Sequence, residues 1–358
     1  MKKRIIGIDV ARALAVIGMI IVNFKVVLGD KGQPWAEKLA AVFEGKAAAT
    51  FVVLAGIGLA LMTNSAVKNQ DKEKLQSGIR RILKRAIFLF VVGLSWIWIW
   101  PADILHFYGI YMLVTLLFIN QSQRSLLIGA LGLVAVYPLI LYFFDYETGW
   151  ILEQYAYPDF WTLQGFFRNL FINGFHPVIP WTAFMLFGLW FGRQDLRDTQ
   201  FLKRSLWISL AVFIATQIVS SGLIHYFSSP HPAELKEITQ IFGTHPMPPM
   251  PLYMVNGISI STTVISACIL LAARYENNKI IDVLNKTGQL ALTFYAAHVI
   301  LGMGLVEGFT STPYGEFSIE FSLIYALVFS LLCMLFAEIW LRYKKAGPLE
   351  WIMRKLTN

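Results

Sequence analysis

The sequence predicts an all-α fold, a polytopic transmembrane helical bundle, and three observations support that prediction. Hydrophobic residues make up 56% of the 358 residues and charged residues only 15%, and the mean hydropathy is +0.58. Long apolar runs recur along the whole chain. Lysine and arginine gather in alternate connecting segments. A soluble domain of this length needs more polar surface, so we expect a single integral membrane domain over residues 1–358.

Apolar runs long enough to cross a bilayer predict about ten spans. They cover residues 5–24, 45–63, 86–101, 103–119, 125–144, 176–192, 205–224, 251–273, 288–307 and 319–341. The segment 160–175 mixes aromatic with polar residues, which fits either an interfacial helix or the lower half of an extra span. The predicted number is therefore about 10–11 spans.

The distribution of positive charge predicts the orientation of the spans. With a cytoplasmic N-terminus, the inward segments contain roughly 23 lysine and arginine residues and the outward loops about 6. This bias predicts that the N-terminus and the C-terminus are both cytoplasmic.

The first predicted span carries charge inside its apolar run. Asp9 and Arg12 are three residues apart, so on a helix their side chains are neighbours and can pair. Asn23 returns to nearly the same face about 16 Å further along. Because an unpaired charge in hydrocarbon is costly, we expect this polar stripe to line a functional cavity inside the bundle. The other interpretation is a buried structural pair without a catalytic role.

The second predicted span is dense in small residues, among them Gly56 and Gly58. Small side chains let two helix backbones approach closely. We therefore expect this span to pack against the first.

Four basic residues precede the apolar part of the third predicted span: Arg80, Arg81, Lys84 and Arg85. Arg81 and Arg85 share one helical face, where two guanidinium groups can clamp phosphates. This pattern predicts a site for a phosphorylated cytosolic donor. The alternative is that the cluster only anchors the helix end at the inner membrane surface.

Three histidines attract attention because of their positions in or near spans. Asp103 and His106 have the spacing at which a carboxylate orients an imidazole, and they are either a general-base pair or a polar cap with an interfacial histidine. His298 lies near the middle of the ninth predicted span and is either a packing residue or a cavity residue. His176 and Trp181, at the start of the sixth span, either place a histidine and an indole at the outer mouth or, as we expect, anchor the chain at the membrane interface.

Other features of the sequence exclude several classes of function. Cys268 and Cys333 lie in separate apolar runs, so neither a disulfide framework nor a cysteine metal site is indicated. The histidine spacings match no tight ligand pattern, and no metal is expected. The sequence contains no Walker A, zinc-protease or nucleophile-elbow motif, which removes support for ATPases and common hydrolases. The net charge of +8 reflects the inward loops, so nucleic-acid binding is not expected.

Five segments together carry a family resemblance: residues 9–18 with Asn23, 43–46 with 54–59, 103–109, 288–295 and 340–357. They are similar to the YeiB-like family of bacterial inner-membrane proteins. That family resembles the catalytic domain of heparan-alpha-glucosaminide N-acetyltransferase and, more distantly, the family 3 membrane acyltransferases. Those proteins move an acyl group from cytosolic acyl-CoA to a sugar or other acceptor across the bilayer. The resemblance implies a multi-pass protein of the inner (plasma) membrane that uses acyl-CoA, expected to be acetyl-CoA, as donor.

The resemblance also implies roles for individual residues. Arg12 looks like the first-span arginine of those acyltransferases, and Asn23 falls where the heparan enzyme carries asparagine. Arg81 and Arg85 look like the basic pair implicated in acyl-CoA binding. His298 falls where the family 3 enzymes often end a similar segment in histidine.

One departure from the family concerns the catalytic base. The active histidine of the heparan enzyme falls at Pro34 here, and no histidine occurs before residue 106. The base of an acyltransferase must therefore come from elsewhere in this chain. His106, with Asp103, and His298 are the candidates.

Three hypotheses follow. In the first, acyl-CoA docks its phosphates on the basic cluster and threads its pantetheine arm along the Asp9, Arg12 and Asn23 face. A histidine then acts as general base or carries the acyl group transiently, while Asn23 orients the acceptor or stabilises the oxyanion. The second hypothesis is a transporter or permease for a small anionic or sugar-like solute, and the third is a non-catalytic scaffold. The expected partners are membrane lipid, acyl-CoA and a small-molecule or glycan acceptor, and a homodimer is left open.

Overall fold

The computed structural model describes residues 4–152, 155–310, 312 and 314–357. Within these residues the secondary structure is helical and no named strand occurs, which confirms an all-α polytopic bundle. The chain divides into two compact units. The first comprises the described residues of Met1–Phe51, Leu196–Leu206 and Ser261–Leu356, and the second those of Val52–Asp195, Trp207–Ile260 and Thr357–Asn358. The expectation of a single membrane domain stays a prediction.

The described helices have the following bounds, in chain order. They are α1 (Ile6–Leu28), α2 (Pro34–Ala41), α3 (Lys46–Lys68), α4 (Lys72–Ser95), α5 (Leu105–Leu116), α6 (Gln123–Phe143), α7 (Leu163–Arg168), η2 (Asn169–Asn173), α8 (Val178–Gly192), α9 (Thr199–Ser228), η3 (Pro232–Glu234), α10 (Leu235–Phe242), α11 (Pro251–Arg274), α12 (Lys279–Gln289), α13 (Ala291–Ala297), η4 (His298–Met303), α14 (Gly304–Phe309), α15 (Ile319–Tyr343) and α16 (Pro348–Thr357).

Among the described residues, seven helices are long and apolar enough to cross a membrane, where 10–11 spans are expected from the sequence. An eighth is added if Leu163–Asn173 and Val178–Gly192, which meet at a bend of 46°, form one broken span. That pair includes most of the ambiguous segment 160–175. The remaining difference between the expected and the observed number of spans comes from α4 and α5. Helix α4 combines basic residues with an apolar half, and α5 has only 12 residues. Both are too charged or too short to meet a span criterion based on composition and length.

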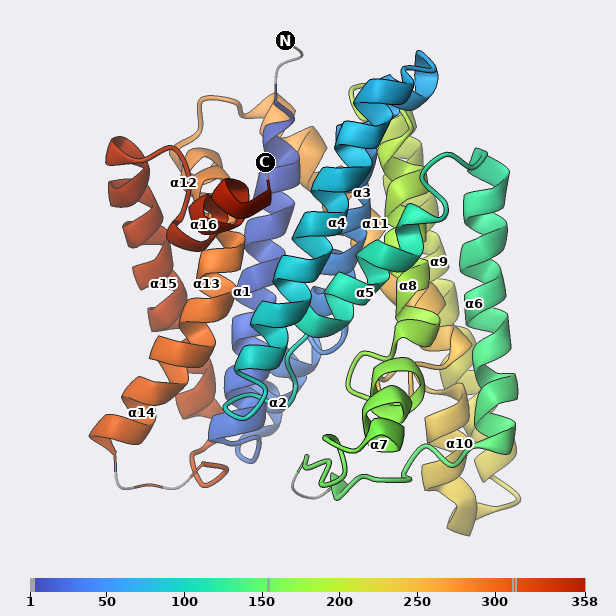
Figure 1. Ribbon diagram of the computed structural model, residues 1–358. Helices are drawn as coiled ribbons and strands as arrows, with labels where there is room; N and C mark the ends of the chain where they lie inside the picture. Colours follow the sequence, from blue (N-terminus) through green and yellow to red (C-terminus); the bar gives the residue numbers. More distant parts are fainter. Residues whose placement is uncertain (1–3, 153–154, 311, 313, 358) are drawn as a thin grey trace. The chain divides into compact units, whose positions relative to one another are not determined.

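In the first unit, α1 is the central helix. Helices α12, α13 and α15 pack against it (Figure 1). The chain before α15 also satisfies carbonyl groups at the end of α1, because Gly315 N–H donates to Val27 O at 2.9 Å and Phe317 N–H to Leu28 O at 3.0 Å. These bonds replace the intrahelical partners that a helix terminus lacks.

Helix α3 uses its small residues in both units. A methyl group added at Gly18 of α1 would lie 2.8 Å from Cβ of Ala47, in the first turn of α3. The expected contact between the first two spans is therefore present at the start of α3. Further along, in the second unit, a Cβ at Gly56 would lie 2.1 Å from the carbonyl oxygen of Met185, so that part of α3 lies directly on α8.

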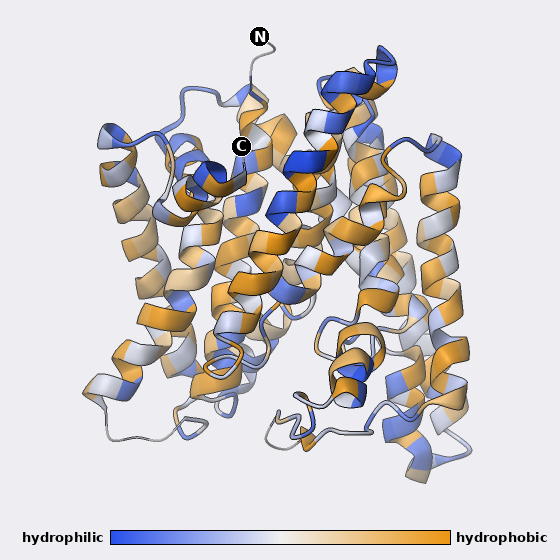
Figure 2. Ribbon diagram, viewed as in Figure 1, coloured by the Kyte–Doolittle hydropathy of each residue, from blue (hydrophilic) through white to orange (hydrophobic). Residues whose placement is uncertain are grey.

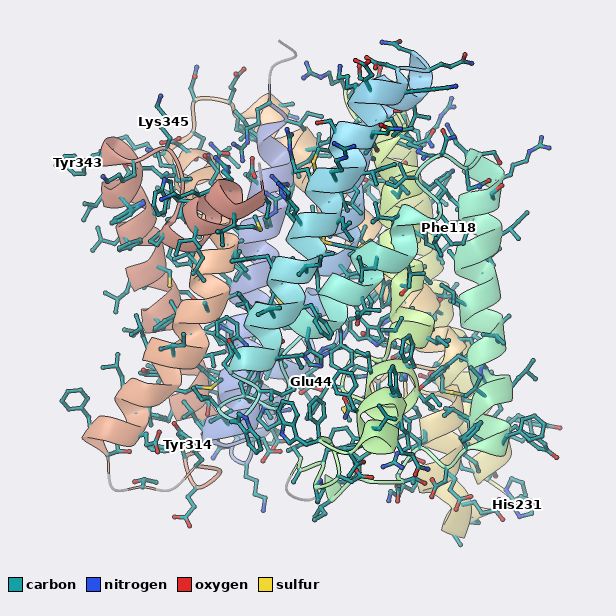
Figure 3. The ribbon with its side chains drawn as sticks, in the orientation of Figure 1. Glu44, Phe118, His231, Tyr314, Tyr343 and Lys345 are labelled. Atoms are coloured by element: carbon teal, nitrogen blue, oxygen red, sulfur yellow. The ribbon has the colours of Figure 1, made fainter. Side chains whose placement is uncertain are left out.

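In the second unit, α4 packs along α5, and α6 packs against α8. Asp71 caps α4 by accepting a hydrogen bond from Lys74 N–H at 3.0 Å. Hydrophilic residues gather over the first half of α4, and hydrophobic residues cover much of the rest (Figure 2). Phe118 lies in the turn between α5 and α6 (Figure 3), and a Cβ at Gly129 would come within 2.7 Å of its ring.

Candidate functional site

The first half of α4 forms the wall of a cavity of about 380 Å³ in the second unit. The lining residues are Glu73, Gln76, Ser77, Arg80, Arg81, Lys84 and Thr357. The six residues from α4 recur every three or four positions, which places their side chains on one face of the helix. Three cationic side chains and one carboxylate leave this cavity positively charged.

Arg85, the fourth member of the predicted basic cluster, is not among the lining residues. Its guanidinium group instead approaches the sulfur of Met62 on α3, with Nη1 at 3.9 Å from Sδ. The structure therefore brings Arg80, Arg81 and Lys84 to one cavity. It turns Arg85, the partner of Arg81 in the predicted phosphate clamp, towards a neighbouring helix.

Asp103 and His106 form a buried pair in the second unit, with exposed fractions of 0% and 1%. Oδ2 of Asp103 lies 3.1 Å from Nδ1 of His106 and also accepts the His106 backbone N–H at 3.1 Å. Oδ1 accepts the indole N–H of Trp96 at 2.9 Å. The carboxylate is thus held by groups on both of its oxygens, which fixes the side of the imidazole that faces it.

The second nitrogen of His106 completes this arrangement. Nε2 is buried and has no hydrogen-bond partner among the described residues. An imidazole held at Nδ1 by a carboxylate and open at Nε2 has the geometry of a general base. The alternative is present in part, because Asp103 caps the start of α5 by accepting the backbone N–H of His106. Its other part, an interfacial histidine, does not fit a side chain that is only 1% exposed.

His176 and Trp181 extend the same cluster. The ring of Phe107 lies 4.0 Å from that of His106 and 6.0 Å from that of His176, and the His176 ring lies 4.6 Å from that of Trp181, all between centroids. Trp181 is 0% exposed, so the prediction that it anchors the chain at the interface is wrong. Nδ1 of His176 and Nε1 of Trp181 also have no partner within the described part of the chain. Buried polar groups are normally satisfied, so this cluster is suited to a polar ligand or water.

Helix α4 connects the cavity with the Asp103–His106 pair. Asp103 packs directly against Gly93 of α4, where a Cβ would lie 2.4 Å from Oδ2 of Asp103. Only a residue without a side chain leaves room for the carboxylate there. Nine residues separate Lys84 from Gly93, a rise of about 14 Å along α4. An extended pantetheine arm is long enough to cover that distance.

In the first unit, Asp9 is 2% exposed and pairs with two arginines. Arg12 Nη1 donates to Oδ1 at 2.6 Å, which confirms the predicted pair. Arg4 donates through Nε to Oδ2 at 2.5 Å and through Nη2 to Oδ1 at 2.8 Å. The sequence predicts Arg4 only as an inward charge, because it precedes α1 and lies five residues before Asp9, outside the helical spacing that indicates a pair.

Asn23 and His298, predicted separately as site residues, lie together in the first unit. Asn23 Nδ2 is 2.8 Å from His298 Nε2, and His298 is fully buried. The His298 ring also lies 5.1 Å from the ring of Tyr295 and 6.0 Å from that of Phe24. With the amide donating as assigned, Nε2 of His298 accepts a hydrogen bond and is already occupied.

No group of three or more histidine, cysteine, aspartate or glutamate side chains that could hold a metal ion occurs in the described residues. The sequence does not indicate the contacts of Trp96 and Thr357 or the link between His176 and His106. Tertiary packing creates these contacts, and spacing along the chain does not reveal them.

Comparison with known proteins gives two family matches. A model described as the catalytic domain of heparan-alpha-glucosaminide N-acetyltransferase matches residues 4–229. A model described as a protein of unknown function (DUF418) matches residues 190–358. The chain is also 23% identical to the uncharacterized protein YxaH of Bacillus subtilis (strain 168) over 407 aligned positions, which cover 99% of this chain and 94% of that protein. The histidines inside the first match are His106, His176 and His225, whereas His298 lies outside it.

Proposed function

Because the chain belongs to the family of the heparan-alpha-glucosaminide N-acetyltransferase catalytic domain, we propose that it is a membrane acyltransferase. The two family matches also confirm the resemblance to the YeiB-like proteins found in the sequence motifs. The donor in this proposal is cytosolic acetyl-CoA. The acceptor is a hydroxyl or amine of a sugar or other small molecule at the outer face of the inner (plasma) membrane.

One observation supports the proposal most strongly. Helix α4 carries a cation-lined cavity near its start and, about 14 Å further on, packs against a buried carboxylate–imidazole pair. The cations suit the phosphates of coenzyme A, and the imidazole suits proton abstraction from an acceptor. Both features lie within the second unit.

The proposed chemistry needs one base and one leaving group. Nε2 of His106 removes the proton from the acceptor hydroxyl or amine as the acceptor attacks the thioester carbonyl. The bond from carbon to sulfur breaks, and the imidazolium returns its proton to the departing thiolate. The products are the acetylated acceptor and free coenzyme A. Asp103 stabilises the transient imidazolium and holds the tautomer.

Asn23 and His298 enter this proposal as a supporting pair. Nε2 of His298 faces the amide of Asn23, so this imidazole is less available as a base than that of His106. His298 also lies outside the acetyltransferase match. We assign the base to His106 and leave to Asn23 the role of orienting groups in the first unit.

A kinetic experiment tests the proposal. The purified protein in phosphatidylcholine nanodiscs is given acetyl-CoA and glucosamine, and release of the coenzyme A thiol is recorded. The variant Arg80→Gln/Arg81→Gln/Lys84→Gln is expected to raise the KM for acetyl-CoA, and His106→Gln is expected to lower kcat at unchanged KM. His225→Gln, at an exposed histidine in the same family match, serves as control. Thiol release that equals the protein-free background would reject the proposal.

The bent pair of α7 with η2 and α8 is the observation that favours a transporter instead. Interrupted helices of this kind occur at the binding sites of secondary transporters. Uptake of unmodified glucosamine into proteoliposomes, without release of thiol from acetyl-CoA, would support that function.

A further inference from the structure

Thr357 has an unusual environment in the second unit. It lines the cation-lined cavity although it is about 280 residues away in sequence from the α4 residues that form the rest of the wall. The residue is 2% exposed, and its hydroxyl oxygen is buried without a hydrogen-bond partner among the described residues. A buried hydroxyl in this state is costly unless a ligand or water completes it.

The charge of the cavity indicates the kind of ligand. Arg80, Arg81 and Lys84 supply three positive charges and Glu73 one negative charge, so the wall carries a net charge of about +2. A phosphate monoester carries a charge of about −1.5 to −2 at neutral pH and presents three strong acceptor oxygens. A phosphodiester, the form found in common lipid headgroups, carries a single negative charge.

The hydrogen-bond donors of the wall match a monoester as well. Arginine and lysine donate several N–H groups, and Ser77 adds a hydroxyl. The Thr357 hydroxyl is a further donor. Three terminal phosphate oxygens have enough lone pairs to accept from all of these groups.

We propose that Thr357 is a ligand of a phosphate monoester in this cavity, and that the monoester is the 3′-phosphate of the acyl-CoA donor. The second part rests on the proposed function. The first part concerns the cavity alone and can hold without it. Thr357 thereby makes the site selective for coenzyme A over its dephosphorylated form.

The test compares two variants of one residue. Thr357→Val keeps the shape of the side chain and removes the hydroxyl, whereas Thr357→Ser keeps the hydroxyl. Dissociation constants for coenzyme A and dephospho-coenzyme A are measured by calorimetry in phosphatidylcholine nanodiscs. Thr357→Val is expected to weaken coenzyme A binding about tenfold and to leave dephospho-coenzyme A unchanged, and Thr357→Ser is expected to bind both like the original protein. Thr310→Val, at a threonine whose hydroxyl donates to the carbonyl group of Val306 in the last turn of α14, is the matched control.

Three results would overturn the proposal. If Thr357→Val weakens the binding of both ligands equally, the residue only shapes the cavity. If the binding of both ligands is unchanged, the residue has no role in binding. The third result is that phosphatidylglycerol in the nanodiscs competes with coenzyme A and that Thr357→Val changes this competition. It would show that the cavity binds a lipid phosphodiester.

A further arm separates this inference from the proposed function. With adenosine 5′-phosphate as the control for its 5′-monoester, adenosine 3′,5′-bisphosphate carries the 3′-phosphate monoester and no acyl group. If it binds in a Thr357-dependent manner while acetyl-CoA is never turned over, the phosphate site stands and the transferase proposal fails. If acetyl-CoA is turned over and none of these ligands depends on Thr357, the transferase proposal stands and this inference fails.

Discussion

His106 is held in one orientation by a carboxylate three residues earlier in the chain, that of Asp103. Asp103 contacts both its Nδ1 and its backbone N–H, and the indole of Trp96 contacts the other carboxylate oxygen. This arrangement leaves Nε2 as the nitrogen that can exchange a proton with a substrate. The value of the histidine as a base therefore depends on the aspartate.

Asp103→Asn is expected to lower the rate of thiol release from acetyl-CoA about a hundredfold or more, with little change in KM for acetyl-CoA. The amide keeps the size of the side chain but cannot stabilise an imidazolium, and it can present N–H to Nδ1. Steady-state kinetics in nanodiscs measure the effect. An unchanged kcat would show that the pair is structural.

The stability of the protein depends on Asp9 and its two arginine partners. Asp9 is buried between them, and their side chains are 54% (Arg4) and 27% (Arg12) exposed. Asp9→Leu is expected to destabilise the protein by about 3–5 kcal/mol, since the guanidinium of Arg12 loses its buried partner. Arg4→Gln removes the more exposed partner and is expected to cost at most about 1 kcal/mol. Thermal unfolding in detergent ranks the two variants, and equal melting temperatures would contradict the assignment.

At the scale of elements, α4 is the helix on which the site depends. Gly93→Ala is expected to displace Asp103 and lower activity strongly, because the added Cβ would lie 2.4 Å from both Oδ2 of Asp103 and the backbone nitrogen of His106. Overpacking of this kind typically costs 1–3 kcal/mol. Gly78→Ala, in the same helix, is the control, since its Cβ would meet only the Thr63 methyl group at 3.6 Å. Similar activity of the two variants would show that α4 does not position the pair.

Helix α13 depends on a carboxylate far along the chain. Glu350 of α16 accepts the backbone N–H groups of Leu292 at 2.8 Å and Thr293 at 3.1 Å, and the Thr293 hydroxyl at 2.5 Å. Two segments of the family resemblance, 288–295 and 340–357, are therefore bonded to each other. Glu350→Ala is expected to destabilise the first unit by about 1–3 kcal/mol and to speed hydrogen exchange at the start of α13. Unchanged exchange there would show that the carboxylate is dispensable.

At the scale of the whole molecule, charge bias predicts an inward C-terminal side of α15. Lys345 points outward from the chain after that helix (Figure 3). Lys345→Cys is expected to react with a membrane-impermeant thiol reagent in inverted vesicles, whereas Glu316→Cys, before α15, is expected to react in right-side-out cells. Cys268 and Cys333 are buried and contribute little background. The opposite labelling pattern would reverse the predicted topology.

Much of the helical fold follows from hydropathy alone. The expected span 251–273 is α11, and 319–341 is α15, each to within two residues. The exceptions are α4 and α5, where a tryptophan-rich apolar segment ends one helix at Ser95 and delays the next to Leu105. Hydropathy does not distinguish a turn from a helix when both are apolar.

The candidate site was predictable only where its partners are close in sequence. The pairs Asp9 with Arg12 and Asp103 with His106 follow from a spacing of three residues on a helix. The contact between Asn23 and His298 joins residues 275 positions apart, and no local pattern indicates it. The same holds for Thr357 in the cavity of α4.

For the molecule as a whole, the proposed function is the transfer of an acetyl group from coenzyme A to an acceptor across a bilayer. Proteoliposomes with isotopically labelled acetyl-CoA on the cytoplasmic side and glucosamine on the other side test it directly by mass spectrometry. We predict labelled N-acetylglucosamine on the acceptor side, an equal amount of free coenzyme A on the donor side, and neither product with His106→Gln. Unlabelled glucosamine that crosses the membrane while acetyl-CoA stays intact would contradict the claim.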